Sequence, residues 1–158
     1  MLVDLLTPNE DKNTSTRFNI PLLTQRLNAA FDWLQQNEST AGYPLGLFGA
    51  STGAAAALQV AAMHNTDIAA VVSRGGRPDL AGDHALGKVR APTLLIVGSR
   101  DFTVIELNRK AYATLNCVKR LETVPHATHL FEEPGKLEAV SVLASEWFSR
   151  YLVTSPAP

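Results

Sequence analysis

The sequence predicts an α/β fold, built as a three-layer α/β/α sandwich around a mostly parallel sheet of about five strands. Apolar runs too short for helices alternate along the chain with segments whose apolar residues recur every three or four positions. Neighbouring parallel strands need a crossover connection, usually a helix, and such crossovers are right-handed. The 158 residues, 46% of them hydrophobic, suffice for one core of ordinary size. We therefore expect a single domain over residues 1–158.

The predicted strands are the short apolar runs at residues 2–6, 45–48, 68–73, 93–97 and 118–124. Three helices are predicted from apolar residues on one helical face, within residues 20–34, 104–115 and 137–151, and a fourth from the alanine-rich run 54–62. Asn19 can cap the first of these helices and Pro21 can occupy its first turn. Residues 7–19, and the Gly- and Pro-rich stretch that follows residue 73, are predicted to be loops.

Charge and cysteine content exclude several classes of function. Fourteen basic and fifteen acidic residues give a net charge of −1, without a basic cluster that could follow a phosphate backbone or an anionic membrane. The single cysteine, Cys117, cannot form an intramolecular disulfide and is interpreted as a buried structural thiol. No apolar run approaches the ~18 residues of a membrane span and no signal peptide is recognisable. We therefore expect a soluble cytoplasmic protein that binds neither nucleic acid nor membranes.

The motif with the most chemical content is Gly49-Ala50-Ser51-Thr52-Gly53, which fits G-x-S-x-G. It lies between a predicted strand and an alanine-rich predicted helix, which is the setting of a nucleophile elbow. In such an elbow a strained turn exposes the serine hydroxyl, and small residues at Gly49 and Gly53 let strand and helix approach. The alternative is a glycine-rich strand-to-helix turn in which Ser51 only caps the helix.

An acid and a base follow Ser51 in the order that this chemistry needs. Asp101 follows the predicted strand 93–97 and His129 follows the last strand, so both stand at carboxyl ends of strands, where open α/β sheets carry their sites. A serine hydroxyl needs a base to remove its proton, and a carboxylate orients the imidazole that does so. The sequence therefore predicts Ser51 as nucleophile, His129 as base and Asp101 as its orienting acid.

Other residues could fill these roles, and each has a structural explanation. Two acids lie in a turn-rich loop, one acid lies inside a helix, one histidine ends a helix, one lies in a polar loop and one is close to His129. In that order, they are Asp79, Asp83, Glu106, His64, His84 and His126. The histidines and carboxylates show no recognised zinc-ligand spacing, so no metal site is predicted.

The chain resembles the dienelactone-hydrolase-like α/β-hydrolases, particularly a branch that can be fused to phosphoribosyltransferase domains. The segments that carry the resemblance are 3–7, 49–53, 73–80, 92–101 and 127–135. The resemblance implies that Ser51, Asp101 and His129 form a catalytic triad. Two departures are His126, where similar sequences often have glycine, and Ser51, where dienelactone hydrolases proper have cysteine.

A complete α/β-hydrolase has further strands before the one that corresponds to residues 2–6, so this resemblance implies a truncated form of the fold. The backbone N–H of Thr52 is expected to donate to an oxyanion, whereas the second donor normally comes from a loop that this chain lacks. We expect strand 2–6 to move beside strand 45–48, into the position of the absent strand. The alternative is a homodimer in which two chains pair their exposed sheet edges.

These observations predict a serine hydrolase that acts on a small carboxylic ester or lactone through an acyl-enzyme, without a metal or organic cofactor. The segment between residues 73 and 92 is too short for a large cap domain, so the pocket should be open. Arg74 and Arg77 in this segment could contact an anionic group of the substrate, or they could be solvated turn residues. The competing hypothesis is a truncated, catalytically weak or silent module that binds a partner or a small molecule.

Overall fold

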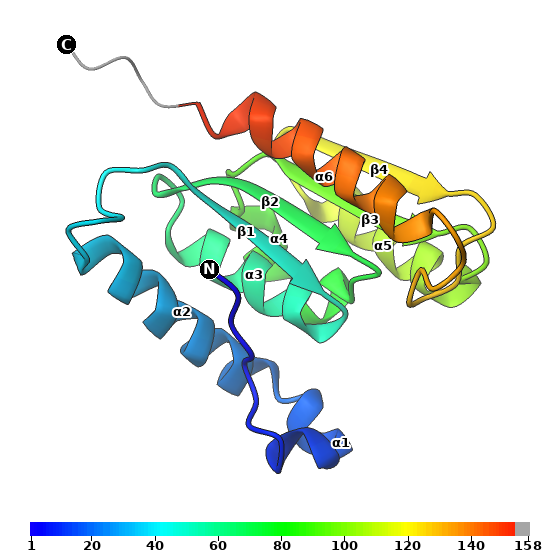
Figure 1. The fold of residues 1–158 in the computed structure, drawn as a ribbon, viewed down its shortest axis with the longest axis horizontal. Coiled ribbons are helices and arrows are strands. Elements are labelled where there is room, and N and C mark those ends of the chain that lie inside the picture. The colour runs from blue at the N-terminus through cyan, green and yellow to red at the C-terminus, as the bar shows by residue number, and fades with distance from the viewer. Residues whose placement is uncertain (154–158) are drawn as a thin grey trace.

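A computed structural model describes residues 1–153 and contains one sheet of four parallel strands (Figure 1). The strands are β1 (Leu45–Ala50), β2 (Ile68–Arg74), β3 (Thr93–Gly98) and β4 (Lys119–Val124), in the spatial order β1-β2-β3-β4. Because all four run the same way, their carboxyl ends meet at one edge of the sheet. The predicted α/β class with a parallel sheet is confirmed.

Helices cover both faces of this sheet. The longer ones are α2 (Ile20–Gln36), α3 (Thr52–Met63), α5 (Phe102–Thr114) and α6 (Lys136–Tyr151). Alternate residues of the strands point to opposite faces, so β2 contributes Val71 to one buried cluster and Val72 to the other. The first cluster includes residues of α2, α3 and α5, and the second includes α6, which gives the three layers seen in Figure 1.

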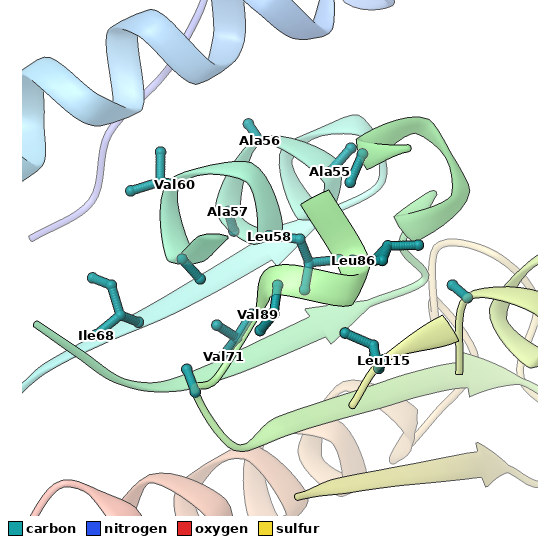
Figure 2. Packing of buried hydrophobic residues seen from close by; sticks show 14 of the residues in the cluster. Ala55, Ala56, Ala57, Leu58, Val60, Ile68, Val71, Leu86, Val89 and Leu115 are labelled. Atoms are coloured by element: carbon teal, nitrogen blue, oxygen red, sulfur yellow. The ribbon is translucent and has the colours of Figure 1, made fainter. Parts of the chain in front are cut away.

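Small side chains let α3 pack closely on the sheet. Residues 54–58 are all buried, and in Figure 2 Ala57 and Leu58 point toward the strands while Ala56 points away from them. The same cluster receives Leu86 from the short helix α4 (Asp83–Lys88). This packing fixes the beginning of α3, and with it the turn that joins α3 to β1.

The predicted first strand is wrong, because residues 2–6 form no strand. They lie beside α2 and β1, where Leu5 and Leu6 pack against the core while Leu2 is fully exposed. The carbonyl of Leu5 accepts a hydrogen bond from Arg26 Nη1 of α2 at 2.8 Å, so this carbonyl does not take part in strand pairing. The expectation that this segment pairs with β1 is therefore also wrong, and the sheet has four strands instead of about five.

Two segments predicted to be loops contain short helices. The first holds η1 (Glu10–Lys12) and α1 (Thr14–Arg17), and the second holds η2 (Pro78–Ala81) and α4. The Asn13 side chain accepts a hydrogen bond from the Ser15 N–H at 2.9 Å, which stabilises the start of α1. The polar and Gly-rich composition of these segments therefore predicted loops, although each segment also contains short helical turns.

Two further expectations concern Cys117 and membranes. Cys117 is half-buried and its Sγ lies 3.7 Å from Thr93 Oγ1, in contact with the core around α3. Within residues 1–153, no helix is both long and apolar enough to cross a membrane.

Candidate active site

Ser51 lies in the turn between β1 and α3, and its backbone has an uncommon conformation, with φ 49° and ψ −123°. Non-glycine residues rarely adopt positive φ, and such strain is concentrated at functional sites. The strained turn is fixed by hydrogen bonds from Ser51 N–H to the Arg74 carbonyl (3.3 Å) and from Arg77 N–H to the Ser51 carbonyl (3.0 Å). The Ser51 side chain makes no capping hydrogen bond to α3, so the interpretation of Ser51 as a helix cap finds no support in its geometry.

The two glycines of the motif have different surroundings. A Cβ atom on Gly49 would lie 2.6 Å from both Ala54 Cα and the Gly53 carbonyl oxygen, so only glycine lets β1 and α3 approach this closely. A Cβ atom on Gly53 would meet nothing within 4 Å. The expected packing role is confirmed for Gly49 and is wrong for Gly53, which lines a cavity beside β1.

Asp101 and His129 form a direct hydrogen bond of 2.7 Å between Oδ2 and Nδ1. Asp101 follows β3 and precedes α5, and its side chain is only 15% exposed, against 39% for His129. The bond turns Nδ1 toward the carboxylate and leaves Nε2 as the ring nitrogen that can exchange a proton with another group. Of the acids considered, Asp101 is the one hydrogen-bonded to His129.

The loops that carry Asp101 and His129 are locked together by backbone contacts. Arg100 N–H donates to the Ala127 carbonyl at 2.9 Å, and His126 N–H donates to Ser99 Oγ at 2.7 Å. Gly98 permits this approach, because a Cβ atom there would lie 2.4 Å from the Ala127 carbonyl oxygen. The pairing of acid and histidine is therefore built into the contact between two loops.

Residues 75–77 form a short loop that connects Ser51 to His129. At one end, Arg77 N–H holds the Ser51 carbonyl. At the other end, a Cβ atom on Gly75 would lie 3.0 Å from the His129 carbonyl oxygen and 3.7 Å from its ring atom Cε1. Ser51 and His129 thus contact the same short loop, although within residues 1–153 no hydrogen bond joins Ser51 Oγ to His129.

Thr52 is the first residue of α3. Its N–H is one of the first four of the helix, which have no acceptor within the helix, and it lies at the positive end of the helix dipole. It is therefore available to a negatively charged oxygen near Ser51.

The two arginines differ in how free they are. The Arg77 guanidinium forms two hydrogen bonds with the Asp79 carboxylate, at 2.9 and 2.8 Å, and this pairing raises the pKa of Arg77. Arg74 ends β2, and its guanidinium lies 5.7 Å from the centre of the Phe131 ring. Burial lowers the pKa of Arg74, which has no carboxylate partner among the ion pairs of residues 1–153. Of the two, Arg74 is the one left to meet an anionic ligand.

Among the other histidines, His64 has structural side-chain contacts, whereas His84 and His126 are exposed. His64 ends α3, where its Nε2 lies 2.6 Å from Asn28 Oδ1 and its ring packs on Phe31 at 4.1 Å. His126 has φ 62°, a backbone conformation that favours glycine over histidine. His84 lies in α4. The described part of the chain contains no group of three or more His, Cys, Asp or Glu side chains placed to hold a metal ion.

One residue that the sequence did not single out supports the histidine loop. Glu133 Oε1 accepts a hydrogen bond from the Thr128 N–H at 3.0 Å, and its hydrogen bonding with Thr128 lowers the pKa of Glu133. Its place four residues after His129, inside the segment that carries the family resemblance, was the available signal. An acid so close to a histidine in sequence is more readily interpreted as a solvated charge.

Comparisons with known proteins agree with this fold. A solved dienelactone hydrolase from Anabaena variabilis is 54% identical, with a TM-score of 0.89 over 96% of this chain and 72% of that chain. The esterase domain of a Rhodothermus marinus protein, 20% identical, has a TM-score of 0.70 over 82% of this chain and 70% of that chain, a likeness of fold alone.

A proposed phosphoribosyl transferase of Mycobacterium tuberculosis is 55% identical over all 158 residues, which span 35% of that curated relative. This match agrees with the expected branch in which such hydrolase-like chains are fused to phosphoribosyltransferase domains. The model of the dienelactone hydrolase family matches residues 10–151. The chain therefore belongs to the dienelactone hydrolase family.

Proposed function

We propose that this chain is a serine hydrolase of small carboxylic esters or lactones, with Ser51, His129 and Asp101 as its triad. The observation that carries the proposal is the 2.7 Å bond between His129 Nδ1 and Asp101 Oδ2, formed at the sheet edge where the strained Ser51 also lies. Membership of the dienelactone hydrolase family supports a hydrolytic reaction.

The proposed reaction has two stages. Ser51 Oγ attacks the carbonyl carbon while His129 Nε2 takes the hydroxyl proton, and Asp101 stabilises the resulting imidazolium. The Thr52 N–H donates to the oxygen that becomes negatively charged. The tetrahedral intermediate then expels the alcohol, which receives the proton from His129, and leaves an acyl group on Ser51. Water activated by His129 releases the acid and restores the serine. Every proton in this scheme is carried by His129, and no cofactor takes part.

Arg74 is the proposed contact for an anionic group on the substrate. It is the residue whose carbonyl accepts the Ser51 N–H, so its backbone adjoins the nucleophile. Arg77 is the weaker choice, since its guanidinium already binds Asp79. A soluble cytoplasmic location fits such a substrate and stays a prediction, as does the absence of nucleic-acid partners.

A second candidate function is a catalytically weak or silent module that binds a partner. The observation in its favour is that β1 ends the sheet beside a cavity of about 1300 Å³, lined by α2, β1 and residues 1–6. Pairing of two chains through β1 as a homodimer stays a prediction for the same edge.

Covalent labelling with a fluorophosphonate, read by intact mass, distinguishes the two functions. Wild type and Ser145→Ala, which removes an exposed serine of α6, should gain one adduct, whereas Ser51→Ala should gain none. The labelled wild type would then be screened with small esters and lactones. Folded wild type without an adduct, or equal labelling of Ser51→Ala, would contradict the proposed enzyme.

A further inference from the structure

Asn108 is a fully buried polar residue of α5, seven positions after Asp101. Its Nδ2 donates hydrogen bonds to the carbonyl of Gly76 at 3.0 Å and to that of Val104, in its own helix, at 2.8 Å. The first bond joins α5 to residues 75–77, the loop that contacts both Ser51 and His129. The helix that begins at the proposed catalytic acid therefore also holds the loop beside the proposed nucleophile and base.

The loop has little freedom around this bond. A Cβ atom on Gly76 would lie 2.0 Å from Ser73 Oγ and 2.6 Å from Ala54 Cβ, so the Gly76 backbone is pressed between β2 and α3. The Gly75 N–H is bound to the Ile96 carbonyl at 2.8 Å, which ties the start of the loop to β3. The Asn108 amide holds the middle of the loop, immediately before Arg77.

Asn108 is not explained by stability alone. Its Oδ1 is buried without a hydrogen-bond partner, and so is Ser73 Oγ, which lies beside Gly76. An unpaired buried polar atom opposes folding, and a leucine of similar shape would remove that atom, although it would also leave the Gly76 carbonyl without the Asn108 hydrogen bond. Positions that sacrifice stability in this way are concentrated at functional sites.

We propose that Asn108 is a positioning residue, which acts through the Gly76 carbonyl to keep the Arg77 N–H on the Ser51 carbonyl. The strained φ of Ser51 persists only while surrounding contacts enforce it, and the Arg77 bond is one of those contacts. Without Asn108 the loop can move away from α5, and the Ser51 turn loses a constraint. The proposal rests on the proposed function for its catalytic consequence, but the loop contact can be measured independently.

The test is Asn108→Leu, with Asn108→Ala as a second variant if the leucine does not fold. Amide exchange followed by NMR should show the Arg77 N–H exchanging at least about tenfold faster, while the Gly75 N–H, bound to β3, stays protected. With a p-nitrophenyl ester, kcat should fall roughly 10- to 100-fold with KM changed less than about twofold, because misplacement by about 1 Å can cost a hundredfold.

Thr93→Val is the matched control, because it removes another buried side-chain bond, from Thr93 Oγ1 to the Ala91 carbonyl, at the opposite end of the sheet. This control should leave Arg77 exchange and kcat unchanged. A folded Asn108 variant with wild-type Arg77 exchange and wild-type kcat would overturn the proposal. If wild type neither labels nor hydrolyses esters, the proposed function fails, and Arg77 exchange alone then decides whether Asn108 holds the loop.

Discussion

The two glycines of the Gly49 to Gly53 motif should respond in opposite ways to alanine. In Gly49→Ala, the new methyl would lie 2.6, 2.6 and 2.7 Å from three main-chain atoms of Gly53 and Ala54. Ordinary carbon contacts are about 3.5–4.0 Å, so α3 must move away from β1 by roughly 1 Å. Overpacking of this kind typically costs about 1–3 kcal/mol, and main-chain atoms cannot rotate aside as a side chain would.

Gly53→Ala is the matched comparison. A methyl at Gly53 has open space around it, and the residue is the second of α3, where its φ is not in the left-handed region. Alanine is favoured over glycine in a helix by up to about 1 kcal/mol, so this variant should be slightly more stable than wild type.

Urea unfolding followed by circular dichroism measures both changes. With a slope of about 1–3 kcal/mol per molar urea, the midpoint of Gly49→Ala should fall by about 1 M, and that of Gly53→Ala should rise by a few tenths. Equal midpoints for Gly49→Ala and wild type would refute the reasoning about the elbow. If Gly53→Ala instead lowers the urea midpoint, and lowers it further at higher protein concentration, the result would indicate that a second chain packs on the β1 side.

Three further changes test the core, the amino-terminal segment and the histidine loop. Leu58→Ala removes a fully buried side chain and should cost about 2–5 kcal/mol in urea unfolding; a smaller loss would mean that the core collapses around the gap. Hydrogen bonds from Arg26 lower the pKa of Glu10 from 4.5 to about 2, so this pair stabilises the fold above pH 4.5 and its contribution is lost as the pH falls towards 2. The shifts of the Arg26 side-chain N–H signals should follow that titration, and a midpoint near 4.5 would contradict it. Glu133→Gln weakens the charge-assisted hydrogen bond from the Thr128 N–H, so this N–H should exchange faster. In wild type, the Thr128 N–H should also lose protection as the pH falls through the lowered pKa of Glu133, because protonation removes the charge from that bond. Unchanged Thr128 exchange in the variant would show that Glu133 does not hold this loop.

Local pattern predicted most of the elements. Asn19 caps α2 by accepting the Leu22 N–H, as expected, and the helices expected at 54–62, 104–115 and 137–151 match α3, α5 and α6 closely. The strand predicted over residues 2–6 does not form, because an apolar run indicates that a segment is buried but not which element covers it. Leu5 and Leu6 satisfy that pattern by packing on the core, and no ladder is formed.

For the candidate site, the sequence placed Ser51, Asp101 and His129 in chain order at the ends of three strands, since the carboxyl ends of parallel strands meet at one edge. It could not show that Asp101 bonds His129 or that Arg77 is already paired with Asp79, because both contacts depend on how the loops fold.

The sequence by itself determined the α/β class, the elbow at Ser51 and the membership of a hydrolase family, because each depends on residue types at fixed local spacing. The tertiary structure decided which glycine of the elbow is closely packed and which acid is hydrogen-bonded to His129. It also decided that Asn108 and Glu133 hold the loops around them. These contacts join residues between five and 32 positions apart, or depend on which backbone lies opposite a glycine. Such distances in sequence leave no periodic trace, since they are set by packing between elements and not by the period of any one helix or strand.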